Sequence, residues 1–94
     1  MGKNISILVV EDSPVQALKL KNVLQKNNYH VAVANSGEEA LNYLYNSKPN
    51  IVISDIIMPG MDGYQLCRQI KINESLKDIP VILLTQLSTP IILL

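Results

Sequence analysis

Four short runs of apolar, mostly β-branched residues are spaced along this chain, and stretches with helical periodicity lie between them. The runs are ISILVV at 5–10, HVAVA at 30–34, IVIS at 51–54 and IPVILLT at 79–85. Apolar runs without alternation are typical of strands that are covered on both faces. Because these runs alternate with helical segments, the chain is predicted to form a parallel sheet with helices on both sides, joined by right-handed crossovers.

The segments between the runs carry signals for the starts of helices. Ser13 has Gln16 three residues later, and Ser36 has Glu39 three residues later. Both patterns predict a capping box, in which each partner's side chain bonds the other's backbone N–H group. A third helix is expected over residues 63–72, so the predicted order of elements is an alternation of strands and helices without an internal linker.

Composition and charge limit the classes of function that suit this chain. Lys and Arg together number 8, as do Asp and Glu, so the formal net charge of zero does not favour nucleic acid or an anionic membrane. No apolar run approaches the ~18–20 residues needed to span a bilayer, and the single cysteine, Cys67, cannot form an internal disulfide. We expect one cytoplasmic domain, spanning residues 1–94, that binds neither nucleic acid nor membrane.

Polar residues follow three of the predicted strands at their carboxyl ends. They are Glu11 and Asp12 after the first strand, Asp55 after the third and Thr85 after the fourth. Ligands of open parallel sheets bind beyond these strand ends, so the three carboxylates are expected to cluster. Clustered carboxylates repel one another unless a proton or a cation intervenes, and a ligand set of oxygens alone suits Mg²⁺. Such a site favours phosphoryl transfer, with Asp55 as the nucleophile.

Each of these residues also has a purely structural interpretation. The acidic pair before a helix can compensate the helix dipole, Asp55 can form a turn, and Thr85 can end a strand. Because all four polar residues fall at one end of the predicted sheet, a shared functional site is favoured over four separate structural roles. Asp62, by contrast, is better suited to capping the next helix than to ligating a metal.

Three short stretches of the chain form a family pattern. These are the pair Glu11-Asp12, Asp55 within VISDIIMPGMDGYQLC, and VILLT ending at Thr85. In these three places, the chain resembles the receiver domain of two-component response regulators. The resemblance covers about Ile5 to Thr85. It implies an α/β, flavodoxin-like (CheY-like) three-layer sandwich with a parallel sheet, in which this chain supplies strand order 2-1-3-4. It also implies a phosphorelay function, in which Asp55 accepts a phosphoryl group from the phosphohistidine of a sensor histidine kinase or a phosphotransfer domain.

The same resemblance implies roles for individual residues. Mg²⁺ would be bound directly by Asp12, Asp55 and the backbone carbonyl of Ile57, with Glu11 acting largely through metal-bound water. Thr85 would be the switch hydroxyl that moves toward the phosphoryl group. A domain of this kind is not a conventional enzyme, but it promotes its own phosphorylation and dephosphorylation.

The chain departs from the family pattern after the fourth strand. Only QLSTPIILL follows Thr85, so the fifth strand with its site lysine and the last two helices of family members have no counterpart, and the domain is interpreted as truncated. Lys71 and Lys77 do not match the position of that lysine. The four-residue spacer at 86–89 is too short for a parallel crossover, which needs ~10–12 residues, so a surrogate strand formed by the tail would have to run antiparallel.

Several interpretations of the tail and of the function remain open. The tail could pair as a surrogate strand, it could be exchanged between subunits, or the chain could be a fragment. Among these, we expect a homo-oligomer formed through the exposed fourth-strand edge or the tail. The alternative function is a non-phosphorylated interaction module with a degenerate receiver fold. A phosphatase of the haloacid-dehalogenase type is disfavoured, because such enzymes need a second Asp two residues after the nucleophile, where this chain has Ile57.

Overall fold

A computed structural model describes residues 4–85 and 90–93 of the chain, and it confirms the alternation of strands and helices. The elements, in chain order, are β1 (Ser6–Val10), α1 (Pro14–Lys26), β2 (His30–Ala34), α2 (Gly37–Asn46), β3 (Ile51–Asp55), α3 (Gly63–Lys71), β4 (Val81–Leu84) and β5 (Pro90–Leu93). The strands form one sheet of order β2-β1-β3-β4-β5, in which the neighbouring pairs β2–β1, β1–β3 and β3–β4 are parallel.

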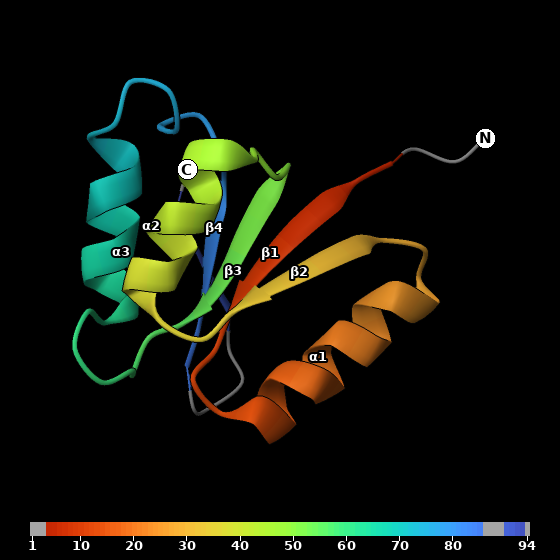
Figure 1. The fold of residues 1–94 in the computed structure, drawn as a ribbon. Helices are drawn as coiled ribbons and strands as arrows, with labels where there is room; N and C mark the ends of the chain where they lie inside the picture. Colours follow the sequence, from red (N-terminus) through yellow and green to blue (C-terminus); the bar gives the residue numbers. More distant parts are fainter. Residues whose placement is uncertain (1–3, 86–89, 94) are drawn as a thin grey trace.

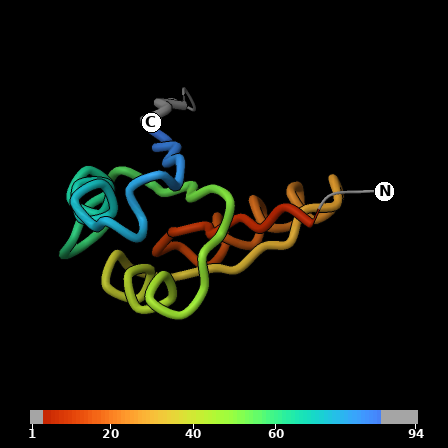
Figure 2. The backbone as a smooth tube through the Cα atoms, turned by 90° about the horizontal axis from the view of Figure 1, so that it is seen from above, coloured from red at the N-terminus to blue at the C-terminus, as the bar shows by residue number. Residues whose placement is uncertain are grey.

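The helices form two layers that enclose the sheet. α1 lies on one side of the sheet, and α2 and α3 lie on the other (Figure 1). Figure 2 shows the same arrangement from above, with the strands running between the two layers. This is the predicted three-layer sandwich, and it explains why the strand sequences are apolar without alternation.

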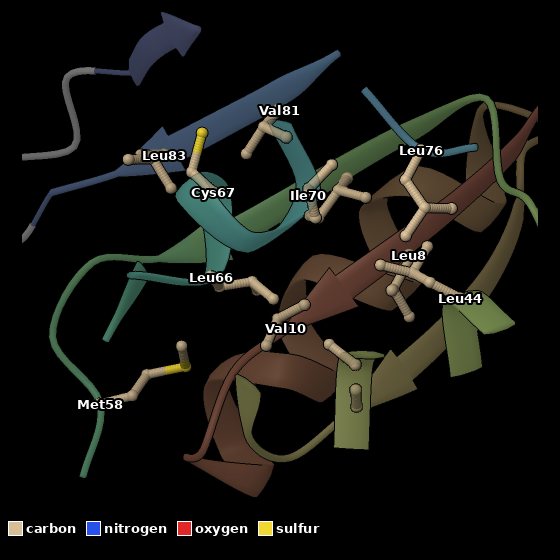
Figure 3. Packing of buried hydrophobic residues seen from close by; sticks show 13 residues of the cluster. Leu8, Val10, Leu44, Met58, Leu66, Cys67, Ile70, Leu76, Val81 and Leu83 are labelled. Atoms are coloured by element: carbon tan, nitrogen blue, oxygen red, sulfur yellow. The ribbon is translucent and has the colours of Figure 1, made fainter. Parts of the chain in front are cut away.

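The core is divided by the sheet into two clusters. Alternate residues of β1 point to opposite sides, so that Leu8 lies in the cluster under α2 and α3 while Ile7 lies in the cluster under α1. Figure 3 shows the larger cluster, in which side chains of α3 lie against those of β4. Leu44 of α2 is fully buried there, and burying such a side chain contributes about 1.5–3 kcal/mol. This packing holds the strand ends in fixed positions.

The edge of the sheet differs from the expectation of an exposed fourth strand. β5 pairs antiparallel with β4, in a register that places Leu84 opposite Pro90 and Val81 opposite Leu93. The prediction that a surrogate strand would run antiparallel is therefore confirmed, and the prediction that β4 forms an exposed edge is wrong. The physical reason is that the five residues between Leu84 and Pro90 are too few for a parallel crossover, so β5 can pair with β4 only in the opposite direction. β5, rather than β4, borders the sheet.

Several element boundaries differ from the sequence-based expectation by one or two residues. β4 is shorter than the apolar run 79–85, and α3 ends at Lys71 rather than at residue 72. At the start of α2, the Ser36 hydroxyl accepts a hydrogen bond from the Glu39 N–H at 3.0 Å, as predicted. The Glu39 carboxylate, however, accepts from the backbone N–H of Asn35 rather than that of Ser36, so the expected capping box is incomplete.

Within the described ranges, no helix is both long and apolar enough to cross a bilayer.

Candidate metal centre

Glu11, Asp12 and Asp55 meet at the carboxyl edge of the sheet. β1 and β3 are parallel neighbours in which Val10 pairs with Ser54, so the residues that follow emerge side by side; the two strand ends lie together in Figure 1. One carboxylate oxygen from each acid lies within 4.8 Å of those from the other two. The structure therefore brings together the three acids that the sequence pattern predicted would cluster.

The Glu11 carboxylate is held at the start of α1. The backbone N–H of Glu11 donates to the carbonyl of Ala34 at 3.0 Å, and its Oε2 accepts from the backbone N–H of Ser13 at 3.1 Å. The Ser13 hydroxyl accepts from the Gln16 N–H at 3.3 Å, so Ser13 caps the helix as predicted. The second half of the expected capping box is wrong, because the Ser13 N–H is bonded by Glu11 rather than by Gln16. Glu11 is thereby linked both to β2 and to α1.

The cluster is electrostatically unfavourable without a counter-charge. Glu11 and Asp55 are half-buried and Asp12 is exposed. Burial raises the pKa of the Glu11 carboxyl above its ordinary value, and the neighbouring charges of Asp55 and Asp12 raise this pKa further, whereas the hydrogen bond from Ser13 lowers it. A cation bound between these carboxylates would remove the repulsion that raises the pKa.

An open cleft of about 590 Å³ gives access to the three acids. Its donor groups are oxygens, which fits a hard divalent cation such as Mg²⁺ that keeps several of its waters and leaves room for phosphate oxygens. The lining residues are Glu11, Asp12, Ser13, Gln16, Asp55, Ile57, Leu84 and Thr85.

β4 forms one side of this cleft and brings Thr85 to it. Asp55 pairs with Leu84 in the β3–β4 register, and the backbone N–H of Ile56 donates to the Leu84 carbonyl at 3.2 Å. Thr85 follows directly and lines the cleft together with Asp55 and Ile57. All of the residues proposed from sequence for this site are therefore neighbours of one cleft.

Ser54 is a contributor that the sequence interpretation did not single out. Its side chain is fully buried, and its hydroxyl donates to the backbone carbonyl of Asp55 at 2.9 Å. This bond orients the peptide group between Asp55 and Ile56. The available signal was a hydroxyl residue inside an otherwise apolar run, immediately before the acid.

Asp62 and the two lysines considered above have structural roles outside the cleft. Asp62 Oδ1 accepts from the Gln65 N–H at 2.8 Å, and the Asp62 N–H donates to Gln65 Oε1 at 2.9 Å, which is a complete capping box at the start of α3. The interpretation of Asp62 as a cap is confirmed. Lys71 Nζ donates to the carbonyls of Lys77 and Ile79, and Lys77 Nζ pairs with Glu74 at 3.2 Å.

Two other chemically reactive residues also lie apart from the acids. His30 is exposed at the start of β2, where its Nε2 lies 3.4 Å from Asn4 Oδ1. Cys67 is buried in the core on α3, and this burial raises the pKa of its thiol, although the positive charge of Lys71 opposes the shift. Cys67 is therefore a buried core residue and not part of the acidic cleft.

Comparison with known proteins agrees with this geometry. Residues 7–92 match the family model described as the response regulator receiver domain. The chain is 38% identical over 79 residues to the protein PilH of Pseudomonas aeruginosa, a match that covers 84% of this chain and 65% of PilH. It is 41% identical over 84 residues to histidine kinase P4 of Formosa agariphila, a match that covers 89% of this chain and 6% of the kinase.

A solved structure gives the same result in three dimensions. The receiver domain of a signal transduction histidine kinase from Syntrophus aciditrophicus is 49% identical, and it superimposes with a TM-score of 0.84 over 89% of this chain and 64% of that one. The chain thus spans about two thirds of the length of PilH and of this receiver domain. On the fold, the clustered acids and these matches, the chain belongs to the family of response regulator receiver domains of two-component systems.

Proposed function

We propose that this chain is a Mg²⁺-dependent phosphoacceptor in a phosphorelay, with Asp55 as the residue that is phosphorylated. The partner would be a sensor histidine kinase or a phosphotransfer domain carrying a phosphohistidine. An oxygen of the Asp55 carboxylate would form a bond to phosphorus while the phosphorus–nitrogen bond of the donor breaks and the imidazole nitrogen keeps the electron pair. The observation that carries the proposal is the approach of three carboxylate oxygens to within 4.8 Å at the end of β1 and β3.

The residues around Asp55 suit the binding of Mg²⁺. Asp12, Asp55 and the backbone carbonyl of Ile57 would hold the ion directly, and Glu11 would act largely through a bound water. When bound, Mg²⁺ supplies positive charge that offsets the carboxylates and the incoming phosphoryl oxygens. Support comes from the raised pKa of Glu11, which reflects burial and neighbouring negative charge, and from the oxygen donors that line the cleft.

Thr85 would act as the switch residue of the proposed site. Its hydroxyl would donate a hydrogen bond to an oxygen of the phosphoryl group and so move with it. The proposal is supported by the position of Thr85 directly after β4, where it lines the same cleft as Asp55. Such a movement would transmit phosphorylation at Asp55 to the end of β4.

The chain would promote its own phosphorylation and dephosphorylation without acting as a conventional enzyme on a separate substrate. Ile57 lines the cleft and is 63% exposed as a residue, and its apolar side chain offers no hydrogen bond to a water that attacks the acyl phosphate. We therefore expect no unusually fast loss of the phosphoryl group. The cytoplasm is the compartment proposed for this exchange.

A mass measurement tests the assignment of Asp55. The wild-type chain is incubated with acetyl phosphate and Mg²⁺, and the intact mass is expected to rise by one phosphoryl group. Asp55→Asn should abolish the gain, whereas Asp62→Asn should retain it, since Asn is also a good helix cap and Asp62 lies in the same loop. An unmodified wild-type chain, or equal labelling of Asp55→Asn, would contradict the proposal.

A second candidate function is assembly without phosphorylation. It is favoured by β5, whose sequence PIIL carries no charge and which borders the sheet, because uncharged border strands are templates for pairing with another chain. The proposed partner is a second copy, so that two β5 strands pair into one continuous sheet. Light scattering over a range of concentrations should then show a dimer in the wild-type chain and in Asp55→Asn alike. A monomer at every concentration rules this candidate out.

A further inference from the structure

Gly63 begins α3 in direct contact with the backbone that carries Asp55. It is buried, and a Cβ atom built on it would overlap the carbonyl oxygen of Asp55 and would lie 2.9 Å from the Cα of Ile56. Its backbone N–H donates to the carbonyl of Ile56 at 2.8 Å. A glycine at this position therefore permits an approach between helix and strand that any other residue would prevent.

The helix cannot move back to make room for a side chain at this position. The conformation of the start of α3 is set by the two reciprocal hydrogen bonds between Asp62 and Gln65, and the Gly63 N–H ties it to the Ile56 carbonyl. The next turns of the helix are fixed by Leu66 and Ile70, which are both fully buried in the core. A displacement of α3 would break the hydrogen bond from the Gly63 N–H to the Ile56 carbonyl and open the core, which is densely packed.

The strand is held equally firmly on its other sides. The Ile56 N–H donates to the Leu84 carbonyl at 3.2 Å, and the buried Ser54 hydroxyl donates to the Asp55 carbonyl at 2.9 Å. The peptide groups on both sides of Ile56 are thus held by β4, by Ser54 and by the start of α3. The Ile57 carbonyl, which is a proposed metal ligand, follows directly in the chain.

We infer that Gly63 is a positioning residue for the acceptor site: the absence of its side chain sets where the Asp55 carboxylate and the Ile57 carbonyl stand relative to Asp12. The inference rests on the proposed function of Asp55. A methyl group at Gly63 would overlap the backbone of Asp55 and Ile56. Because α3 is anchored in the core, the overlap would be relieved only by distorting the Asp55–Ile57 backbone that carries the proposed ligands. The cost would appear in the metal site as well as in the stability of the fold.

Gly37 provides a matched control. It is also buried and also stands first in a helix after a capping residue, Ser36. A Cβ atom there would meet the side chain of Met61, with its Sδ at 2.7 Å, its Cγ at 2.9 Å and its Cβ at 3.0 Å. The Sδ and Cγ can rotate away, which leaves one tight contact with the Met61 Cβ, whereas the backbone atoms beside Gly63 cannot rotate away.

The experiment compares Gly63→Ala with Gly37→Ala in the full chain. Carbonyl ¹³C shifts recorded without metal should move at Asp55, Ile56 and Ile57 in the first variant and stay in place in the second. Mg²⁺ affinity, measured by calorimetry where each variant is fully folded, should fall by about tenfold or more in Gly63→Ala, as for other groups that orient metal ligands. It should be unchanged in Gly37→Ala.

The outcomes separate this inference from the proposed function. Unchanged carbonyl shifts and unchanged Mg²⁺ affinity in a folded Gly63→Ala variant would overturn the role of Gly63. Failure of the wild-type chain to bind Mg²⁺ would overturn the metal site, and the carbonyl shifts would still decide the role of Gly63. If Gly63→Ala does not fold, the wild-type chain is titrated with Mg²⁺ instead. The amide resonance of Gly63 should then shift with the same midpoint as that of Asp55, and the amide resonance of Gly37 should stay fixed. A Gly63 resonance that does not shift would refute the inference.

Discussion

The carboxylates of Glu11 and Asp55 approach to within 4.8 Å of each other, although they belong to different strand ends. The approach follows from the pairing of Val10 with Ser54 in the β1–β3 ladder. Both acids are half-buried, so water screens their repulsion less than it would at an exposed surface. This proximity underlies the first two predictions.

Mg²⁺ should stabilise the folded chain. The ion would bind the clustered carboxylates of the folded state and not the separated carboxylates of the unfolded state, so the free energy of unfolding should rise by about 2.7 kcal/mol when free Mg²⁺ is 100 times its dissociation constant. Thermal unfolding with and without Mg²⁺ measures the effect. Asp55→Asn and Asp12→Asn should largely lose the stabilisation, and Asp62→Asn should keep it; equal stabilisation of all three would argue against the site.

Without metal, the stability of the fold should fall as pH rises through the titration range of Glu11. The folded-state pKa of Glu11 is raised, chiefly by burial and then by the nearby charges, so the folded chain holds a proton at pH values where the unfolded chain has released it. The free energy of unfolding therefore decreases as the pH rises from the ordinary pKa of Glu11 to its raised pKa.

Urea unfolding in the presence of a chelator, at a series of pH values, measures this dependence. Glu11→Gln should flatten the curve in this window and raise stability at neutral pH, because the amide oxygen can still accept from the Ser13 N–H. A wild-type curve that rises through the window, or a Gln variant with the same slope, would show that Glu11 does not titrate in this way.

Ser54→Ala should destabilise the fold by about 1 kcal/mol, since it removes a buried hydrogen bond. The hydroxyl donates to the Asp55 carbonyl from a fully buried side chain. Urea unfolding gives the change in free energy, and Ser75→Ala, at an exposed position, serves as the reference substitution. If both variants had the same stability as wild type, the Ser54 hydroxyl would have no energetic role.

Cys67 should react slowly with a thiol reagent in the folded chain and rapidly after unfolding. Burial on α3 raises the pKa of its thiol, and the thiolate is the reactive form. The sign for stability follows from the same shift: above the ordinary thiol pKa of about 8.5, only the unfolded state ionises freely, so stability falls with rising pH. Absorbance-detected thiol modification with and without urea checks the reactivity, and a fast reaction in the folded chain would contradict it.

Much of the candidate site could be predicted from local patterns in the chain. The strand-end positions of Asp12, Asp55 and Thr85 follow from where each apolar run stops, and the capping role of Asp62 follows from Gln65 three residues later. These signals are short in range, because periodicity and capping depend on residues only a few positions apart along the chain. The role of Ser54 could not be predicted, since a single hydroxyl in an apolar run does not reveal which carbonyl it meets.

The sequence by itself determined the order of strands and helices, the acids that end β1 and β3, and the antiparallel direction of β5, which the short spacer at 86–89 imposes. Only the tertiary structure decided that Glu11 bonds the Ser13 N–H rather than leaving it to Gln16, that β5 borders the sheet, and that Gly63 lies against the Asp55 backbone. The difference has a physical reason. Direction and capping are set by a few adjacent residues, whereas close approaches between elements are set by how the whole core packs.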